Sequence, residues 1–236
     1  MRKRTPILVV CALALVAPFT GAQDGSQSEP TAELRLQIVP TTSSNQHVPP
    51  AVAWLDPIQG TPALPFTSNG KYTLLQKNRT FIPHLQVIPV GSVVQFPNAD
   101  PFFHNVFSLF EGKRFDLGLY EAGSSRSVTF SREGASYIFC NIHPDMSAVV
   151  LAVATPLYAV AAADGSFALH GIPPGNYRLH LWIEGVPQPV LDGLGRNLHI
   201  TSTGLDLGTI KLPLTRPDSH PNKFGGSYDE HTHSTY

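Results

Sequence analysis

The sequence predicts an all-β protein built from two β modules, and three observations support this. Short apolar segments recur between residues 71 and 155, separated by turns rich in Pro, Gly, Asn and Asp. A second alternating pattern begins near Leu157, with polar and apolar residues in turn. No segment carries the period of an amphipathic helix. We therefore expect β-sandwiches or barrels throughout.

Residues 1–22 have the three-part layout of a secretory signal peptide. Basic residues at positions 2–4 precede an apolar run over 7–18, and small residues end at Ala22, where cleavage is expected. The run is shorter than the roughly 20 residues of a membrane-spanning helix. Cys11 lies inside it without a small residue before it, so we interpret this cysteine as discarded with the signal. A periplasmic or secreted protein with no membrane span after cleavage is the expectation.

Removing the signal takes away three basic residues and no acidic ones, which moves the formal charge from −1 to −4. A mildly acidic chain gives no reason to expect nucleic acid or an anionic membrane as a partner.

The expected organisation follows the turn signals. Residues 23–70 hold a polar linker, two early strands at 34–38 and 52–55, and a loop over 56–70. Residues 71–155 form one β domain and residues 156–213 a second, while 214–236 form a disordered tail with three histidines. The strands expected in the first domain are 72–76, 85–90, 92–96, 105–109, 127–130, 136–140 and 148–154.

Cysteine and methionine use is the most informative feature of the composition. After cleavage the chain keeps one cysteine, Cys140, and one methionine, Met146, with His143 between them. A lone thiol in an exported protein is either a liability or a ligand. A thiolate, two imidazoles and a weak thioether are the ligand set of blue-copper centres, and His104 can supply the second imidazole. The prediction is one type 1 copper per chain, bound by His104, Cys140, His143 and Met146.

These residues also have other interpretations. Cysteine and methionine can be core filler, and His104 can be a satisfied polar residue at a loop end. Zinc fits poorly because methionine is a poor zinc ligand. A Cys140 nucleophile paired with His143 lacks an obvious oxyanion hole.

The segment from Phe81 to Val153 resembles the cupredoxins, most closely the amicyanin-like and plastocyanin-like members. The matching features are Phe81-Ile82-Pro83, the segment 90–98, His104-Asn105-Val106 and the loop CNIHPDM at 140–146. The resemblance implies a Greek-key barrel that carries electrons on one copper. It also implies that Asn105 ties the two ligand loops together by hydrogen bonds, and that His143 is the electron port. Phe102, Phe103 and Pro144 would then extend an apolar docking patch.

The run DGSFALHGIPPGNYRLHLW at 164–182 resembles the carboxypeptidase regulatory-like sandwich, a transthyretin-like fold. Its early strands are either the segments 34–39 and 52–55, in a sandwich split by the cupredoxin, or missing from two sequential modules. A spacer or docking role is the default for this module, with carbohydrate binding through Trp54 or Trp182 a weaker option.

The leading function is an electron carrier whose redox partner is a protein such as a c-type cytochrome or a dehydrogenase. A copper chaperone or buffer that uses the tail histidines His220, His231 and His233 is the alternative, and an adhesion scaffold is the third. Four ligands would leave no open coordination position, so an enzyme is not expected. His84 is expected to be a surface or edge histidine.

Overall fold

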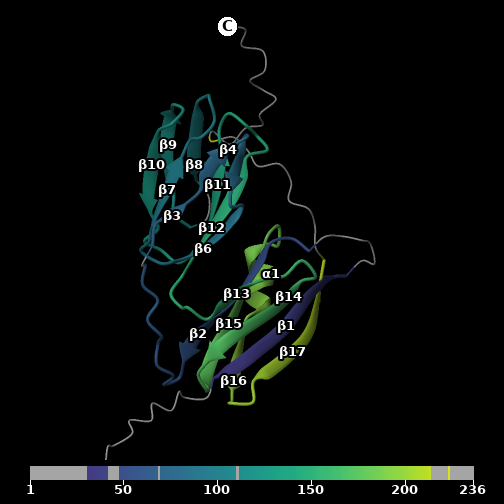
Figure 1. Cartoon of the computed structure of the whole chain (residues 1–236). Coiled ribbons are helices and arrows are strands. Elements are labelled where there is room, and N and C mark those ends of the chain that lie inside the picture. The colour runs from purple at the N-terminus through teal and green to yellow at the C-terminus, as the bar shows by residue number, and fades with distance from the viewer. Residues whose placement is uncertain (1–30, 42–47, 69, 110–111, 214–222, 224–236) are drawn as a thin grey trace, which may run out of the picture.

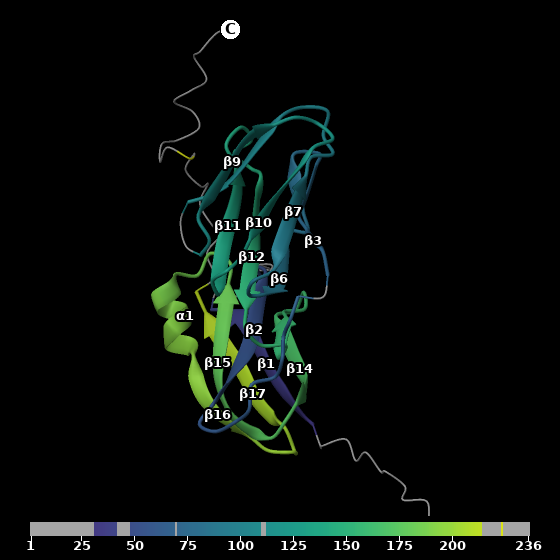
Figure 2. The same ribbon diagram turned by 90° about the vertical axis from the view of Figure 1, so that its left-hand side faces the viewer.

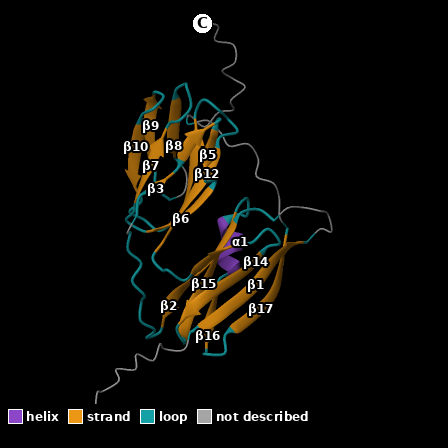
Figure 3. Cartoon of the chain, in the orientation of Figure 1, coloured by secondary structure: helices purple, strands orange, loops and turns teal. Residues whose placement is uncertain are grey.

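The computed structural model describes residues 31–41, 48–68, 70–109, 112–213 and 223. Strands make up most of this part of the chain, and one short helix, α1, accompanies them (Figures 1 and 3). The predicted all-β fold class is confirmed. No helix in the described ranges is long and apolar enough to cross a membrane.

The central sandwich, defined as strands β3 to β12, lies in the upper part of Figure 1. One sheet has the order β10-β7-β3 and the other the order β6-β12-β11-β8-β9, with β4 and β5 forming a separate hairpin. Its strands are β3 (Tyr72–Thr73), β4 (Leu75–Lys77), β5 (Thr80–Ile82), β6 (Leu85–Pro89), β7 (Val93–Pro97), β8 (His104–Ser108), β9 (Phe115–Tyr120), β10 (Ser125–Thr129), β11 (Gly134–Cys140) and β12 (Ser147–Val153). Side chains from both sheets fill one apolar core between them.

The outer sandwich contains the strands on either side of this segment in the sequence. Its sheets have the orders β14-β1-β17 and β13-β2-β15-β16. Its elements are β1 (Ala32–Pro40), β2 (Ala51–Ile58), β13 (Tyr158–Val160), β14 (Ser166–Ile172), β15 (Gly175–Ile183), α1 (Gln188–Leu194), β16 (Arg196–Ile200) and β17 (Leu205–Leu212). Strand β1 pairs with β14 and β17, and β2 pairs with β13 and β15. The chain therefore leaves this sandwich after β2, builds the central one, and returns at β13. Kinship with the carboxypeptidase regulatory-like family stays a prediction.

Strand β12 joins the two sandwiches because both of its faces are buried. Ala148, Val150 and Ala152 point into the central core. The alternate residues Val149, Leu151 and Val153 belong to the core of the outer sandwich. This double burial explains why the sequence of β12 is a continuous apolar run and not an alternating one.

Two polar contacts reinforce the junction between the sandwiches. The Trp182 indole N–H of β15 donates to the Tyr137 hydroxyl of β11 at 3.2 Å. His84, in the loop between β5 and β6, bonds through Nε2 to the Glu184 carboxylate at 2.7 Å. These contacts and the shared apolar face hold the central sandwich against β15.

Several elements were not predicted. Strand β9 has the sequence FDLGLY and lies at the edge of its sheet, where Asp116 and Gly118 are tolerated although both disfavour strands. The expectation of no helix is wrong for α1, which packs beside β15 (Figure 2). This helix has seven residues, of which only Leu191 is buried, and it begins just after Pro187. So short a helix with one buried residue carries no detectable period, although proline is well tolerated at a helix start.

Candidate metal centre

Two neighbouring strands bring His104 and Cys140 to one end of the central sandwich. His104 begins β8 and Cys140 ends β11, and these strands are antiparallel neighbours with Cys140 opposite Val106. The loop that leaves β11 then turns back into β12, and it carries His143 and Met146. All four predicted ligands therefore come from this end of the sandwich.

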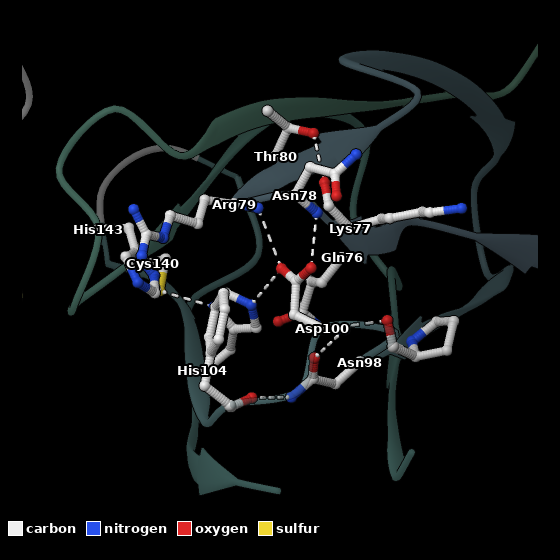
Figure 4. Close-up of polar contacts among 12 residues, drawn as sticks. Gln76, Lys77, Asn78, Arg79, Thr80, Asn98, Asp100, His104, Cys140 and His143 are labelled. Carbon is white, nitrogen blue, oxygen red and sulfur yellow. Dashed lines mark hydrogen bonds and ion pairs between the residues drawn. The ribbon is translucent and has the colours of Figure 1, made fainter. Parts of the chain in front are cut away.

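Three of the four predicted ligands converge on one point (Figure 4). The Cys140 sulfur lies 3.6 Å from Nδ1 of His104 and 3.6 Å from Nδ1 of His143. The three ligand atoms all lie within 4.8 Å of one another. His104 and Cys140 are fully buried, whereas His143 is partly buried.

This arrangement fits a copper ion. A transition metal sits about 2.3 Å from a thiolate sulfur and about 2.0–2.1 Å from an imidazole nitrogen. With bond angles between tetrahedral and trigonal, those lengths put sulfur and nitrogen roughly 3.6–3.8 Å apart. The observed separations agree, and one thiolate with two imidazoles is a donor set that suits copper.

Met146 is fully buried in the core that also contains Cys140. Its backbone closes the loop, because the Cys140 N–H donates to the Met146 carbonyl at 3.1 Å and the Met146 N–H donates to the His143 carbonyl at 3.0 Å. Its axial contact with the metal stays a prediction.

The surroundings of Cys140 favour the thiolate form. Burial raises the pKa of the thiol, but the contact with the His104 ring in its cationic form and hydrogen bonds from the backbone N–H groups of Asn105, Ile142 and His143 outweigh burial, so the pKa lies below its usual value. A thiolate is the form that binds metals.

The two histidines have opposite electrostatic settings. Burial lowers the pKa of His104. The hydrogen bonds and charges of Cys140 and Asp100 raise this pKa by more than burial lowers it, so the net shift is upward. The pKa of His143 is lowered by burial and by the nearby charges of His104 and Arg79. His143 is therefore neutral at physiological pH, the form in which imidazole binds a metal.

Asn105 links the two ligand loops through its backbone. Its carbonyl accepts from the Asn141 N–H at 3.2 Å. Its side-chain amide instead donates to the Asp116 carboxylate at 2.7 Å. Lys223 contacts both Asn141 and Asp116. Its backbone N–H donates to the Asn141 side chain, and its ammonium lies 3.0 Å from the Asp116 carboxylate.

The predicted docking patch divides into one partly buried and two exposed residues. The Phe102 ring packs against both histidines, with centroids 5.3 Å from His104 and 5.5 Å from His143. Phe103 is 55% exposed and Pro144 is also exposed, together with Ile142. Phe102 is thus part of the wall of the site, and the other two lie at the surface.

Sequence analysis missed Asp100. This carboxylate is 4% exposed, and its Oδ2 lies 2.9 Å from Nε2 of His104. Burial raises its pKa, but hydrogen bonds from the Arg79 N–H, from His104 and from the Asn78 N–H bring the pKa below its usual value, so the group is ionised. The available signal was an aspartate four residues before a ligand histidine. In the sequence this aspartate is indistinguishable from the other turn residues rich in Pro, Gly, Asn and Asp.

Other residues singled out from the sequence lie away from the site. His84 is at the junction with the outer sandwich, where it contacts Glu184 and the Ser147 carbonyl. Trp54 is partly buried in β2 and stacks on His180, and Trp182 is buried. The signal peptide and the histidines at 220, 231 and 233 lie outside the described residues.

Comparison with known proteins gives likeness of structure only. No protein-family model matches the sequence, and no curated protein is similar to it at a meaningful level. The purple cupredoxin from Nitrosopumilus maritimus is 24% identical with a TM-score of 0.32, over 36% of this chain and 100% of its own. A mutant of amicyanin in the reduced Cu(I) form is 19% identical with a TM-score of 0.34, over 37% of this chain and 86% of its own.

A copper-containing nitrite reductase from Thermus scotoductus is similar over 50% of this chain, with 23% identity and a TM-score of 0.34. This chain covers 28% of that protein. The prediction that the chain is not an enzyme is corrected by this finding, since an enzyme is among the structures similar to it. At these identities and scores the likenesses assign no activity, and the functional argument rests on the site.

Proposed function

We propose that the chain is exported and binds one copper ion as a type 1 centre, through which it carries single electrons between redox proteins. The observation that carries this proposal is the convergence of Cys140, His104 and His143 within 4.8 Å. Met146 would complete the ligand set with its thioether sulfur. When bound, copper supplies a one-electron couple whose potential the thiolate and thioether tune.

The residues around such a site would have two roles, exclusion of water and stabilisation of the thiolate. The buried Cys140 and His104 keep water away from the ligand atoms, and the backbone N–H groups around Cys140 hold it as a thiolate. A rigid, dry set of ligands needs little rearrangement when charge changes.

His143 is the only one of the three converging ligands that is partly exposed, and the exposed apolar side chains of Phe103 and Ile142 lie in the two loops that carry His104 and His143. A partner docked on these side chains would lie closest to the site. The occupant that this chemistry favours is another redox protein with an apolar rim, such as a c-type cytochrome or a dehydrogenase.

The first experiment is a visible titration of the signal-free protein with Cu(II), beside Cys140→Ser. We expect an intense blue band that saturates at one copper per chain, and its loss in the variant. His180→Gln is a matched control, because His180 lies on β15 of the outer sandwich and should leave the band unchanged. Voltammetry should then show reversible one-electron exchange. A colourless copper response would contradict the type 1 proposal, and a blue site that releases copper to an acceptor without redox cycling would favour the chaperone alternative.

A further inference from the structure

The Asp100 carboxylate is held by a tight turn of the β4–β5 hairpin (Figure 4). The Asn78 N–H donates to Oδ1 at 2.6 Å, and the Arg79 N–H donates to Oδ2 at 3.0 Å. Both turn residues have positive φ, 55° and 58°, which points their two amides the same way. Two such backbone donors form a fixed cradle for an anion.

The same carboxylate faces His104 and leaves that ring no choice of tautomer. Both oxygens of this carboxylate already accept backbone N–H groups, so the carboxylate is the acceptor at the 2.9 Å contact and Nε2 of His104 is the donor that carries the proton. In the neutral ring the other nitrogen, Nδ1, then has a free lone pair. That nitrogen is the one that faces the Cys140 sulfur at 3.6 Å.

We propose that Asp100, anchored by the Asn78–Arg79 turn, is the positioning residue that fixes the tautomer and orientation of His104 and so presents Nδ1 to the metal. A hairpin with no residue among the predicted ligands thereby controls one of them. The copper part of this inference rests on the function proposed above, while the tautomer of the metal-free ring does not.

The guanidinium of Arg79 also helps to hold this turn in position, by packing on an aromatic ring. It lies over the Phe102 ring at 5.4 Å, and Phe102 in turn contacts His104. The turn therefore contacts His104 indirectly through two side chains, the Asp100 carboxylate and the Phe102 ring. A cation over an aromatic face contributes modestly at an exposed site.

The substitution Asp100→Asn separates this role from simple packing, because the amide has the same size. An asparagine NH₂ group in place of one oxygen meets an N–H donor whichever way the amide is turned. An NH₂ group at the Oδ1 position loses the hydrogen bond from Asn78 and loosens the turn. An NH₂ group at the Oδ2 position faces Nε2 of His104, and that conflict is relieved only if the ring moves its proton to Nδ1, which blocks the nitrogen that faces Cys140. We therefore expect copper affinity to fall by about 10- to 100-fold, as is typical when a group that orients a metal ligand is changed.

The experiment has two readouts. Nitrogen-15 NMR of the metal-free protein, at a pH where the ring is neutral, reports the His104 tautomer; competition with a Cu(I) chelator reports affinity. We expect a proton on Nε2 in the wild type and a population with the proton on Nδ1 in Asp100→Asn. The matched control is Asp145→Asn, which removes an exposed charge from the other ligand loop without touching His104 and should leave tautomer and affinity unchanged.

Each outcome decides the matter. A wild-type ring protonated on Nδ1 overturns the proposal without any variant, as does an Asp100→Asn protein that keeps the Nε2 proton and binds copper as tightly as the wild type. Should Asp100→Asn fail to fold, the wild-type spectrum alone still tests the assignment. A wild type that shows the expected tautomer but no blue copper band would contradict the type 1 function and leave the role of Asp100 standing.

Discussion

The two loops that form the candidate site differ in how they are held. In the loop from Asn98 to His104, the side chains of Asn98, Asp100 and His104 are all less than 5% exposed and bonded to the surrounding structure. In the loop from Asn141 to Met146, Ile142 is 43% exposed and His143 reaches the surface. His104 is thus enclosed and held in place, whereas His143 is partly open to solvent, so the two histidines should respond differently to the same change.

The largest expected effect comes from removing each histidine in turn. His104→Gly and His143→Gly should each weaken copper binding by more than the ~10- to 100-fold typical of residues behind the ligands. Added imidazole should restore the blue band in His143→Gly, because that position opens to solvent. It should not restore the band in His104→Gly, whose site is fully enclosed.

Visible absorption during an imidazole titration measures this difference, with Cys140→Ser as the control that no imidazole can rescue. Equal recovery in both glycine variants would mean that the loops are equally open and would remove the contrast between them.

A smaller effect is expected from the asparagines that begin the two loops. Asn98 is buried, donates to the Phe102 carbonyl at 2.8 Å and accepts from the Asp100 N–H at 3.0 Å. Asn98→Ala leaves both groups without that partner, at a cost of about 2–4 kcal/mol in the free energy of unfolding. Asn141→Ala should cost less than about 1 kcal/mol, because its side chain is only partly buried.

Urea unfolding of the metal-free variants gives both values from the shift in midpoint. Similar losses at the two positions would show that the loop of His143 is as firmly built as the loop of His104.

The smallest expected effect is a pH dependence of stability that comes from the contact between His84 and Glu184, beside the end of the His143 loop. His84 bonds to Glu184 and to the carbonyl of Ser147, the residue after Met146. The hydrogen bond to Glu184 raises the pKa of His84 most; burial opposes it, and the charge of Glu184 and the Ser147 carbonyl add to it. Because the folded-state pKa lies above the unfolded value, this contribution to stability is complete below about pH 6.5 and is lost as pH rises through the raised pKa.

The His84 side chain is 42% exposed, so the contribution is about 0.5 kcal/mol or less. Unfolding midpoints of the wild type and Glu184→Gln, compared from acidic to alkaline pH, should differ below the pKa and converge above it. A difference that stays constant across this range would assign the contact to hydrogen bonding without charge.

The ligand residues could be predicted from the sequence because cysteine and methionine are rare in this chain. With one cysteine and one methionine left after the expected cleavage, their spacing around His143 carried chemical information on its own. Asp100 carried no such signal, since aspartate before proline is common in turns and its partners at 78 and 79 lie on another hairpin. Only the folded chain shows that these backbone amides meet the carboxylate.

The architecture was predictable where pairing is local and not where it is distant. Most strands of the central sandwich follow from alternating patterns and turns. The outer sandwich depends on β1 pairing with β17, with Leu34 opposite Leu205, and no local pattern encodes a contact of that range. The sequence therefore left a split sandwich and two sequential modules both open.

The doubly buried strand β12 has a consequence for the order of folding. Pairings within the central sandwich span short stretches of chain, so their loop-closure entropy is lower than that of β1 with β17, and they are expected to form first. Once formed, the central sandwich brings the ends of β2 and β13 together and shortens the effective loop that the outer sandwich must close. Until the outer sandwich forms, Val149, Leu151 and Val153 are an apolar surface exposed to water. The chain is therefore expected to be most prone to aggregate in the interval between the two folding events.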